Sequence, residues 1–434
     1  MINYIERKEV TVVDDIMGSG KTSWAIQFIN NAPIHYKFIV VTPYLKEIER
    51  IKNATSHRRN FIEPTQKNKT GTKIYSLKTL IENGNDIVTT HALFKSIEQD
   101  ILDLLTLHHY ILIMDEVAEV VEQLDIKQSD IKILLNSKGL EVDELSAQVS
   151  WLNNEYDGQF NGLKKIVKSD KVFLQDSSAF IWLFPYEIFQ KFRQVYILTY
   201  MFDAQIQKYY FDLSGIEYCK KSIAIDEKQT SDLTNNLIDG VQTQKFEIVY
   251  KLIDYRKPDV SKFKQLIKIC PNTKLNDVGN SQSKHGYDNL TFTKLKALKA
   301  SSPLAKLLRN NLKNFFINIC KAKSTEIIWT CPKDSIKALK GKGYTTSHVS
   351  SNMRASNDFK DRTVVAYILN KFLHPSISNF FSSKGIIVDQ DAYALSELLQ
   401  WLFRSAIRDG KEIQLYIPSY RMRKLLEMWL NGEM

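Results

Sequence analysis

The sequence predicts an α/β protein of two tandem domains, each a parallel sheet flanked by helices, with an insertion in the first domain. Three observations predict this fold. Short β-branched runs alternate with helix-like segments over the first 215 residues, which is typical of an open, doubly wound sheet. The same alternation resumes after about residue 300. The chain has 434 residues, several times the ~150 of a typical domain, so it has room for two domains.

Five apolar runs predict the parallel strands of the first domain, residues 1–215. Each is short, rich in β-branched residues and flanked by polar or turn residues. They span residues 9–13, 38–41, 86–89, 110–114 and 195–198. Helices are expected over residues 22–30 and 93–107. Residues 120–190 are longer than one connection between strands requires, and they predict an inserted subdomain.

The second domain is expected over residues 216–434. Its strands are predicted from three further apolar runs, at residues 326–330, 363–368 and 412–417. Helical patterns span residues 303–321 and 395–408. The turn-rich stretch 271–289 predicts a loop.

Composition excludes several classes of protein. With 44% hydrophobic and 25% charged residues, the chain is neither fibrous nor largely disordered. No apolar run approaches the ~18 residues of a membrane-spanning helix, and the start carries charge where a signal peptide is apolar, so a cytoplasmic protein is expected. The four cysteines form no C-x-x-C pair, so reduced thiols are expected rather than a zinc site or disulfides.

Positive charge is concentrated in one stretch. The net charge is +10, and it divides into −6 for residues 1–250, +12 for residues 251–323 and +4 for residues 324–434. This asymmetry predicts a polyanion partner, and nucleic acid is favoured over a membrane surface because no lipid anchor accompanies the basic segment. A basic surface without a partner remains the alternative.

A phosphate-binding loop is the strongest signal. An apolar strand ends at Val13 and is followed by the loop residues Gly18, Ser19 and Gly20, and by a helix that begins with Lys21, Thr22 and Ser23. Glycines let backbone N–H groups close around phosphates, and the helix N-terminus adds a positive dipole. Lys21 is expected to reach the β and γ phosphates, and the Thr22 hydroxyl to ligate Mg²⁺.

An acidic pair follows another strand. Residues 110–114 deliver Asp115 and Glu116 to the carboxyl-terminal edge of the predicted sheet, where ligands bind in such folds. Asp115 is expected to hold Mg²⁺, partly through water, and Glu116 to act as the general base for an attacking water. An acidic pair alone could equally be a solvated loop, but here it accompanies a phosphate loop.

Two basic helices are further candidates. Gln400, Arg404 and Arg408 are spaced by four, so one helix would place them in a single stripe, with Gly410 as its stop; a solvated polar face is the alternative. A second helix is expected to start at Ser302 and Pro303.

That second helix carries its charge on one side. Lys306, Arg309 and Lys313 fall together, opposite an apolar face formed by Leu304, Leu308, Asn311, Leu312, Phe315 and Ile319. The three cations are expected to contact nucleic-acid phosphates. A surface helix kept soluble by its charges is the alternative.

Taken together, these motifs resemble the superfamily 2 helicases, the DExD/H-box class of two tandem RecA-like domains. DIMGSGKT resembles motif I, with Asp15 in place of a small residue, and DEVA resembles motif II. The weaker matches follow in the expected order. They are Thr42 and Pro43 for motif Ia, Thr90 and His91 for the T-T-H motif, Thr199 for motif III, EIIWTCPKDS for motif IV, and Ala355, Ser356, Asn357 and Arg362 for motif V.

Motif VI is matched by Gln400 and Arg404. Its last arginine normally lies three residues further on, where this chain has Ile407, and Arg408 follows one position later. That shift rotates the second guanidinium about 100° around a helix, so the arginine-finger role is transferred more firmly to Arg404 than to Arg408. The resemblance is greatest to the small helicases of bacteriophages and related mobile elements.

The resemblance implies an ATP- and Mg²⁺-dependent helicase or translocase, acting on DNA more than RNA in the replication or recombination of a phage or mobile element. Nucleic acid would be contacted through Thr42, Pro43, Thr90, His91 and Ser356, and replication or recombination proteins are candidate partners. A P-loop kinase and an ATP-switched nucleic-acid-binding initiation factor without unwinding are the alternatives. Glu116 and the second domain argue against the kinase, and Lys21 with the acidic pair favours turnover over switching.

Overall fold

The computed structural model describes residues 9–43, 45–169, 171–227, 248–280, 290–351 and 358–434. The chain folds into two compact units. Unit 1 comprises the chain up to Arg256 together with His374–Val388, and unit 2 comprises Lys257–Leu373 and Asp389–Met434. The expected boundary between residues 215 and 216 therefore lies inside unit 1, because the strands that follow it join the sheet of that unit.

Unit 1 contains an eight-stranded sheet in the order β13-β12-β1-β11-β5-β2-β4-β3. The strands are β1 (Val10–Asp14), β2 (Phe38–Thr42), β3 (Phe61–Ile62), β4 (Asp86–Thr90), β5 (Ile111–Asp115), β11 (Gln194–Thr199), β12 (Tyr218–Ile225) and β13 (Tyr250–Asp254). All neighbouring pairs are parallel except β12 with β13. The five strands predicted for this domain are confirmed to within one residue at each end.

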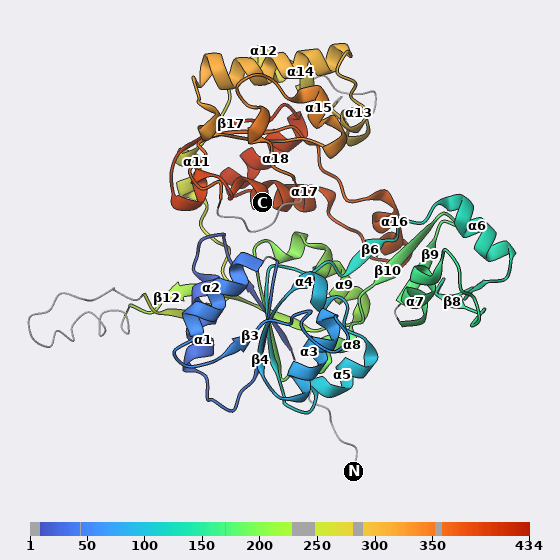
Figure 1. Cartoon of the computed structure of the whole chain (residues 1–434). Helices are drawn as coiled ribbons and strands as arrows, with labels where there is room; N and C mark the ends of the chain where they lie inside the picture. The colour runs from blue at the N-terminus through green and yellow to red at the C-terminus, as the bar shows by residue number, and fades with distance from the viewer. Residues whose placement is uncertain (1–8, 44, 170, 228–247, 281–289, 352–357) are drawn as a thin grey trace, which may run out of the picture. The chain divides into compact units, whose positions relative to one another are not determined.

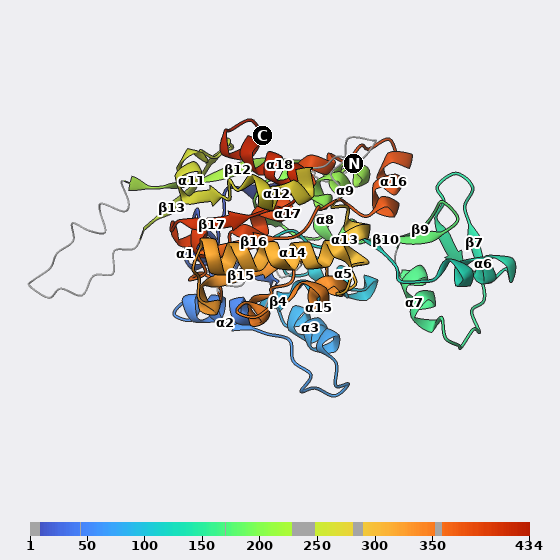
Figure 2. The same cartoon turned by 90° about the horizontal axis from the view of Figure 1, so that it is seen from above.

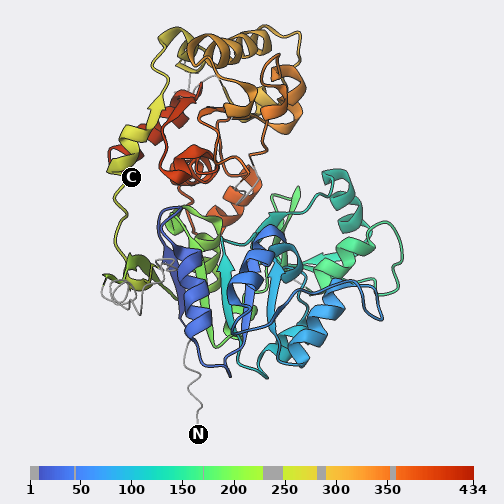
Figure 3. The same ribbon diagram turned by 60° about the vertical axis from the view of Figure 1, so that its left-hand side comes forward.

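Helices lie on both faces of this sheet (Figures 1 and 3). They are α1 (Lys21–Asn31), α2 (Leu45–Thr55), α3 (Lys73–Glu82), α4 (His91–Phe94), α5 (Gln99–Leu105), α8 (Glu187–Gln190), α9 (Ile206–Ser214) and the short η1 (Phe202–Ala204). The expected single helix over 93–107 is wrong, because the chain leaves the helix after α4 and Glu98 starts α5 as its N-cap.

The expected insertion is a small subdomain between β5 and β11. A three-stranded antiparallel sheet joins β6 (Val121–Gln123), β10 (Ala179–Leu183) and β9 (Lys171–Gln175). A hairpin of β7 (Leu140–Val142) and β8 (Val149–Trp151) and the helices α6 (Gln128–Asn136) and α7 (Asn161–Ser169) complete it.

A late helix of the chain packs on this subdomain. Helix α16 (Pro375–Ser383) belongs to unit 1 although the residues before and after it belong to unit 2. The Phe380 ring lies 5.4 Å from the Phe173 ring, and the Asn379 amide donates to the Asp176 carboxylate at 3.2 Å. We call residues 374–388 the returning arm. Nothing in the local sequence pattern distinguishes it from unit 2.

Unit 2 contains a four-stranded parallel sheet in the order β14-β17-β16-β15. Its strands are β14 (Ile267–Ile269), β15 (Ile327–Thr330), β16 (Val364–Tyr367) and β17 (Ile413–Tyr416), and β15, β16 and β17 confirm three predictions. The helices are α11 (Ser261–Leu266), α12 (Thr273–Asn280), α13 (Phe292–Lys296), α14 (Pro303–Lys313), α15 (Ile336–Leu339), α17 (Gln390–Leu402) and α18 (Tyr420–Leu430). Short turns η2 (Asn314–Ile319), η3 (Ser324–Glu326), η4 (Lys333–Ser335), η5 (Thr345–Ser347) and η6 (Ala406–Asp409) connect them.

Helix α14 runs across one face of this sheet (Figure 2). Ser302 caps it by accepting a hydrogen bond from the Ala305 N–H, and Pro303 is its first residue, as predicted. The expected single helix to residue 321 is wrong, because the wider π turn η2 takes over at Asn314. The expected loop over 271–289 is also wrong for residues 273–280, which form α12; its residues 281–289 lie outside the described residues.

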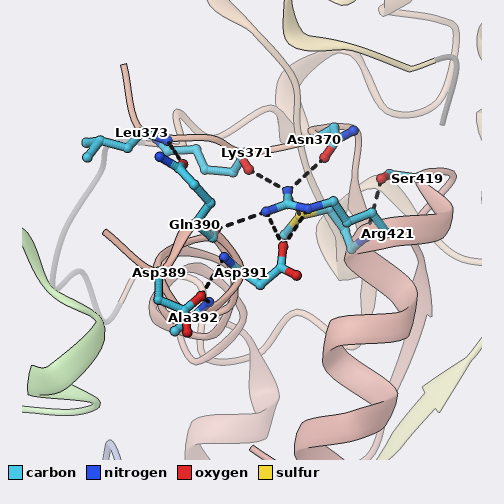
Figure 4. Close-up of polar contacts among 10 residues, drawn as sticks. Asn370, Lys371, Leu373, Asp389, Gln390, Asp391, Ala392, Ser419 and Arg421 are labelled. Atoms are coloured by element: carbon cyan, nitrogen blue, oxygen red, sulfur yellow. Dashed lines mark hydrogen bonds and ion pairs between the residues drawn. The ribbon is translucent and has the colours of Figure 1, made fainter. Parts of the chain in front are cut away.

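The two ends of the returning arm are fixed to unit 2 by one side chain. The Arg421 guanidinium, on the first turn of α18, donates to the carbonyl of Lys371 at 2.7 Å and to that of Gln390 at 2.9 Å, and it pairs with Asp391 at 2.6 Å (Figure 4). A further bond goes to Asn370 at 3.1 Å. Arg421 thus clamps the chain just before and just after the arm. Across the described residues of both units, no helix is long and apolar enough to span a bilayer.

Candidate nucleotide-binding site

The predicted phosphate loop lies at the carboxyl end of β1. Gly18 and Gly20 have φ angles of 85° and 100°, in the left-handed region that favours glycine, and Gly20 is the N-cap of α1. Lys21, Thr22 and Ser23 form the first turn of that helix. The loop therefore directs backbone N–H groups and the positive end of the helix dipole toward one place, which is the requirement for binding phosphate.

Lys21 is held against the loop itself. Its ammonium donates to the carbonyl of Ile16 at 2.8 Å and to the carbonyl of Asp15. Burial lowers the pKa of Lys21, whereas the nearby carboxylates, Glu116 first, raise it. Four carboxylates surround this one ammonium, namely Glu116, Asp15, Asp14 and Asp115. If a nucleotide bound, the Lys21 ammonium could exchange these two carbonyls for phosphate oxygens without losing hydrogen-bond partners.

Asp115 and Thr22 meet across the sheet edge. Asp115 is the last residue of β5, and its carboxylate accepts a hydrogen bond from the Thr22 hydroxyl at 3.3 Å. Burial, followed by the charge of Glu116, raises the pKa of Asp115 to about 7. A hydroxyl and a carboxylate in contact are the hard oxygen donors that suit Mg²⁺, which takes its remaining ligands from water and phosphates. The residues present therefore fit the expected metal.

Glu116 has an unusual backbone conformation. Its φ is 74°, which is uncommon for a residue with a side chain, and its N–H donates to the carbonyl of Leu198 on the neighbouring strand at 2.9 Å. Such conformations persist where surrounding structure enforces them, and they are frequent at functional sites. The bond to β11 thus fixes the turn that presents Glu116 beside Lys21 and Asp115.

The aspartate that departs from motif I has a structural role. The Asp15 carboxylate accepts from its neighbour Ile16 N–H at 2.7 Å and from Ile223 N–H of β12 at 3.0 Å, and the side chain is buried. The adjacent Asp14 carboxylate accepts from Phe202 N–H at 3.1 Å, and burial raises the pKa of Asp14 to about 6. The loop is therefore anchored to segments on either side of β1. A small residue at position 15 would lose one anchor.

The predicted nucleic-acid contacts of unit 1 gather at the same sheet edge. Thr42 and Thr90 are paired residues at the ends of β2 and β4. Thr42 is fully buried and Pro43 follows it half-buried, while the Thr90 hydroxyl caps α4 by accepting from Leu93 N–H. The His91 ring nitrogen Nε2 lies 3.0 Å from the carbonyl of Asp115. His91 therefore links this row to the acidic pair.

The expected arginine stripe of unit 2 is wrong as a helix. Helix α17 ends at Leu402; Arg404 follows in a turn, and Arg408 lies in the 3-10 turn η6, which ends at Gly410. Beyond the end of the helix, the Ser405 hydroxyl donates a hydrogen bond to the Leu402 carbonyl at 2.7 Å. Gln400 is on the helix and half-buried.

The two arginines differ in burial. Arg404 is 4% exposed, whereas Arg408 is half-buried. The Ala406 N–H donates to the carbonyl of Arg362 at 2.9 Å, which ties this segment to the residues that precede β16. Ala355, Ser356 and Asn357, the start of the predicted motif V, lie outside the described residues.

The basic face of α14 is only partly as expected. Lys306 and Lys313 are exposed, but the Arg309 guanidinium donates to the carbonyl of Ala338 at 3.0 Å and is half-buried. Asn311, on the opposite face, is buried and donates to the carbonyl of Leu275. Ile319 is 46% exposed rather than packed, because it lies in the wider π turn η2, whose residues no longer follow the α-helical spacing of α14.

Two parallel-sheet α/β units, with a glycine loop, a lysine and an acidic strand end at one sheet edge, define a P-loop fold of the tandem RecA-like class. Family models match over residues 261–430, the YonV C-terminal Rossmann-like domain, and over residues 121–182, the YonV middle domain. The SPbeta prophage-derived protein YonV of Bacillus subtilis strain 168 is 38% identical over 436 residues, covering 98% of this chain and 100% of that protein. The chain belongs to the YonV family.

Three of the solved structures that resemble this chain are described as helicases or as a DEAD box protein. The DUF1998 helicase MrfA, bound to DNA and AMPPNP, is 11% identical, with a TM-score of 0.34 over 98% of this chain and 48% of that one. A hypothetical ATP-dependent RNA helicase of Sulfolobus tokodaii is 11% identical, with a TM-score of 0.24 over 99% and 91% of the two chains. A DEAD box protein of Methanococcus jannaschii is 12% identical, with a TM-score of 0.26 over 99% and 88%.

Proposed function

We propose that this protein is an ATP-dependent nucleic-acid translocase or helicase, acting on DNA in the replication or recombination of a phage or mobile element. The observation that carries the proposal is the contact of Thr22 with Asp115 beside Lys21 and Glu116, at the end of a glycine loop. The prophage origin named for the YonV relative supports the genetic setting.

Lys21 and the loop would bind the nucleotide phosphates. The Lys21 ammonium neutralises charge on the β and γ phosphates once it exchanges its two carbonyl partners for phosphate oxygens. Thr22 and Asp115 would hold Mg²⁺, which supplies charge compensation between the phosphates. Asp115 serves the metal only as a carboxylate, so its raised pKa couples metal binding to loss of a proton.

Glu116 would orient the water that attacks the γ-phosphate and accept its proton. The fixed left-handed turn holds this carboxylate in place before the substrate arrives, which is how positioned groups contribute to catalysis. A phosphate-transferring kinase has no need of a carboxylate placed for water. The placement of Glu116 therefore favours hydrolysis over phosphate transfer.

Gln400, Arg404 and Arg408 would complete the reaction from unit 2. An arginine that reaches the transferring phosphoryl group stabilises charge in the transition state. Arg404 lies in the turn that follows α17 and Arg408 in the next turn, η6, so the two are expected to contribute unequally.

The nucleic acid would be held through its backbone, as a translocase needs, by groups that do not read bases. Thr42, Pro43, Thr90, His91 and Ser356 are the proposed contacts, and Lys306, Arg309 and Lys313 add charge. His91 offers a route to the ATP site, since its ring contacts the main chain of Asp115.

ATP hydrolysis measured with no nucleic acid, with single-stranded DNA, with duplex DNA and with RNA tests the proposal. The expected result is hydrolysis that DNA stimulates and that Lys21→Ala abolishes. Hydrolysis unaffected by every nucleic acid, or phosphate transfer to a small acceptor, would overturn it. A strand-displacement assay then separates unwinding from translocation alone.

A further inference from the structure

A β-hairpin of unit 1 extends past the sheet beside the phosphate loop. Strand β12 pairs with β1 only as far as Lys221, which lies opposite Val13. Beyond that point, Ser222 to Ile225 pair with β13 alone. The hairpin therefore projects beyond the carboxyl-terminal edge of the sheet, at the edge where the loop begins.

Two sets of hydrogen bonds attach this projection to the loop and its helix. The Asp15 carboxylate accepts from the Ile223 N–H, as described above. The Gln27 side chain, on α1, donates to the carbonyl of Ile248 at 2.6 Å and accepts from the Tyr250 N–H at 3.0 Å. One amide thus binds the hairpin backbone at two points. The hairpin is therefore held to the loop by Asp15 and to α1 by Gln27.

The Tyr250 ring lies directly on Gly20. A Cβ placed on Gly20 would overlap three ring atoms, so only glycine allows this approach. Ile225 is paired with Tyr250, so both side chains lie on the same face of the hairpin. Ile225 is 50% exposed and Ile248 is 42% exposed. These residues form an apolar and aromatic surface, the hairpin platform, next to the phosphate loop.

We propose that the hairpin platform binds the base of the nucleotide whose phosphates occupy the loop, with Tyr250 as the stacking residue. The inference rests on the proposed nucleotide site. A base is a flat apolar ring system joined to phosphates through a ribose, and it stacks on aromatic side chains. Exposed isoleucines beside a glycine loop leave apolar surface in water, and a stacked base would cover it.

Binding of ADP and of inorganic tripolyphosphate, each with Mg²⁺, tests the assignment. In Tyr250→Ala the affinity for ADP should fall about 10-fold, the loss expected when one stacked base loses its partner, while the affinity for tripolyphosphate stays unchanged. Tyr250→Phe keeps the ring and should bind ADP like the wild type. Tyr250→Leu keeps apolar bulk over Gly20 but has no aromatic face, so it should lose ADP affinity as Tyr250→Ala does. It is the control for any disturbance of the loop by the small alanine side chain.

The outcomes separate the two proposals. Lys21→Ala should lose both ligands, and if it keeps both the phosphate site itself is wrong. Unchanged ADP affinity in both Tyr250→Ala and Tyr250→Leu would overturn the base platform alone. Equal losses of ADP and tripolyphosphate in both variants would also overturn it, and would make Tyr250 a support of the loop.

Discussion

The residues at the carboxyl ends of the strands carry different charged groups in the two units, and the two sets are used differently. In unit 1, Asp14, Asp15, Asp115 and Glu116 surround a single ammonium. In unit 2, Arg421 and Arg423 follow β17, and their guanidinium groups donate to main-chain carbonyls, while Arg421 also pairs with Asp391. The first arrangement suits a metal and an activated water, whereas the second uses its charge to hold the chain of its own unit. Charge at a sheet edge can therefore serve a ligand or the fold, and the hydrogen-bond partners of each side chain distinguish the two.

Removing the lysine from the acidic cluster should have the largest effect. Lys21→Ala is expected to reduce ATP hydrolysis to background, because four carboxylates would then face the phosphates without their counter-charge. A phosphate-release assay measures it. Lys67→Ala, an exposed lysine of the same unit, is the control and should match the wild type.

Glu116→Gln separates binding from chemistry at the same edge. The amide keeps the size of the side chain but cannot accept the proton of the attacking water. ATP binding should be retained and hydrolysis lost. Hydrolysis at the wild-type rate would show that another group is the base.

The arginines of unit 2 give the next effect. Arg404→Ala should lower turnover by ~10³-fold or more, the low end of the range for arginine fingers, with a much smaller effect on ATP binding. Arg408→Ala is the matched variant, because Arg404 lies in the turn after α17 and Arg408 in the separate turn η6. Wild-type turnover in Arg408→Ala would show that only one of the two acts on phosphate.

The raised pKa of Asp115 makes metal binding depend on pH. Below about pH 7 the carboxyl is protonated, so the affinity for Mg²⁺-ADP should fall about tenfold for each pH unit below that value. The free protein should respond in the opposite sense. A raised pKa stabilises the fold at low pH and this stabilisation is lost as pH rises from about 4 to about 7, so Asp115→Asn should be the more stable protein at pH 8. Calorimetric titration and thermal unfolding across pH 5–8 test both; a flat binding profile contradicts the assignment.

The smallest effect is expected on α14. Arg309 bonds to Ala338, so the test uses the two exposed lysines, Lys306→Ala with Lys313→Ala. DNA affinity should fall without regard to base sequence, and the salt slope should decrease by up to ~2 units, one for each phosphate contact. Lys411→Ala with Lys424→Ala removes the same charge elsewhere on unit 2 and is the control. Identical salt slopes in the two double variants would leave α14 without a nucleic-acid role.

Sequence predicts a structural feature of these units where the residues that determine it are adjacent in the chain. Buried strands and the glycine loop are encoded by adjacent residues, so their positions follow from pattern alone. Helix α17 ends at Leu402, and the turn that follows is bonded from the Ala406 N–H to the carbonyl of Arg362, which comes from another part of unit 2. Helical periodicity carries no record of such contacts.

The hairpin platform could not be predicted from sequence for a similar reason. Tyr250 lies far from Gly20 along the chain and meets it only because β12 and β13 extend the sheet. Asp15 is visible as a departure from the motif, but its second hydrogen bond, to Ile223, is a tertiary contact. The departure of Asp15 from the motif I pattern is the sequence signal that could point to its contact with Ile223.

The returning arm limits how this protein can be divided into fragments. The chain passes between the units at residues 256–257, 373–374 and 388–389, so no continuous fragment consists of one whole unit and nothing of the other. A fragment ending at Arg256 would leave the faces around Phe173 and Tyr209 without α16, and a fragment starting at Lys257 would carry that helix with nothing to cover its aromatic side chains. Cleavage at one crossing would give two fragments held together only by non-covalent contacts; after a cut between residues 256 and 257 these include the contacts of α16 with Phe173 and Tyr209, so the nicked molecule should migrate as intact protein until it is denatured. The two units are interlaced along the chain rather than joined one after the other, and they are expected to be synthesised and to fold together.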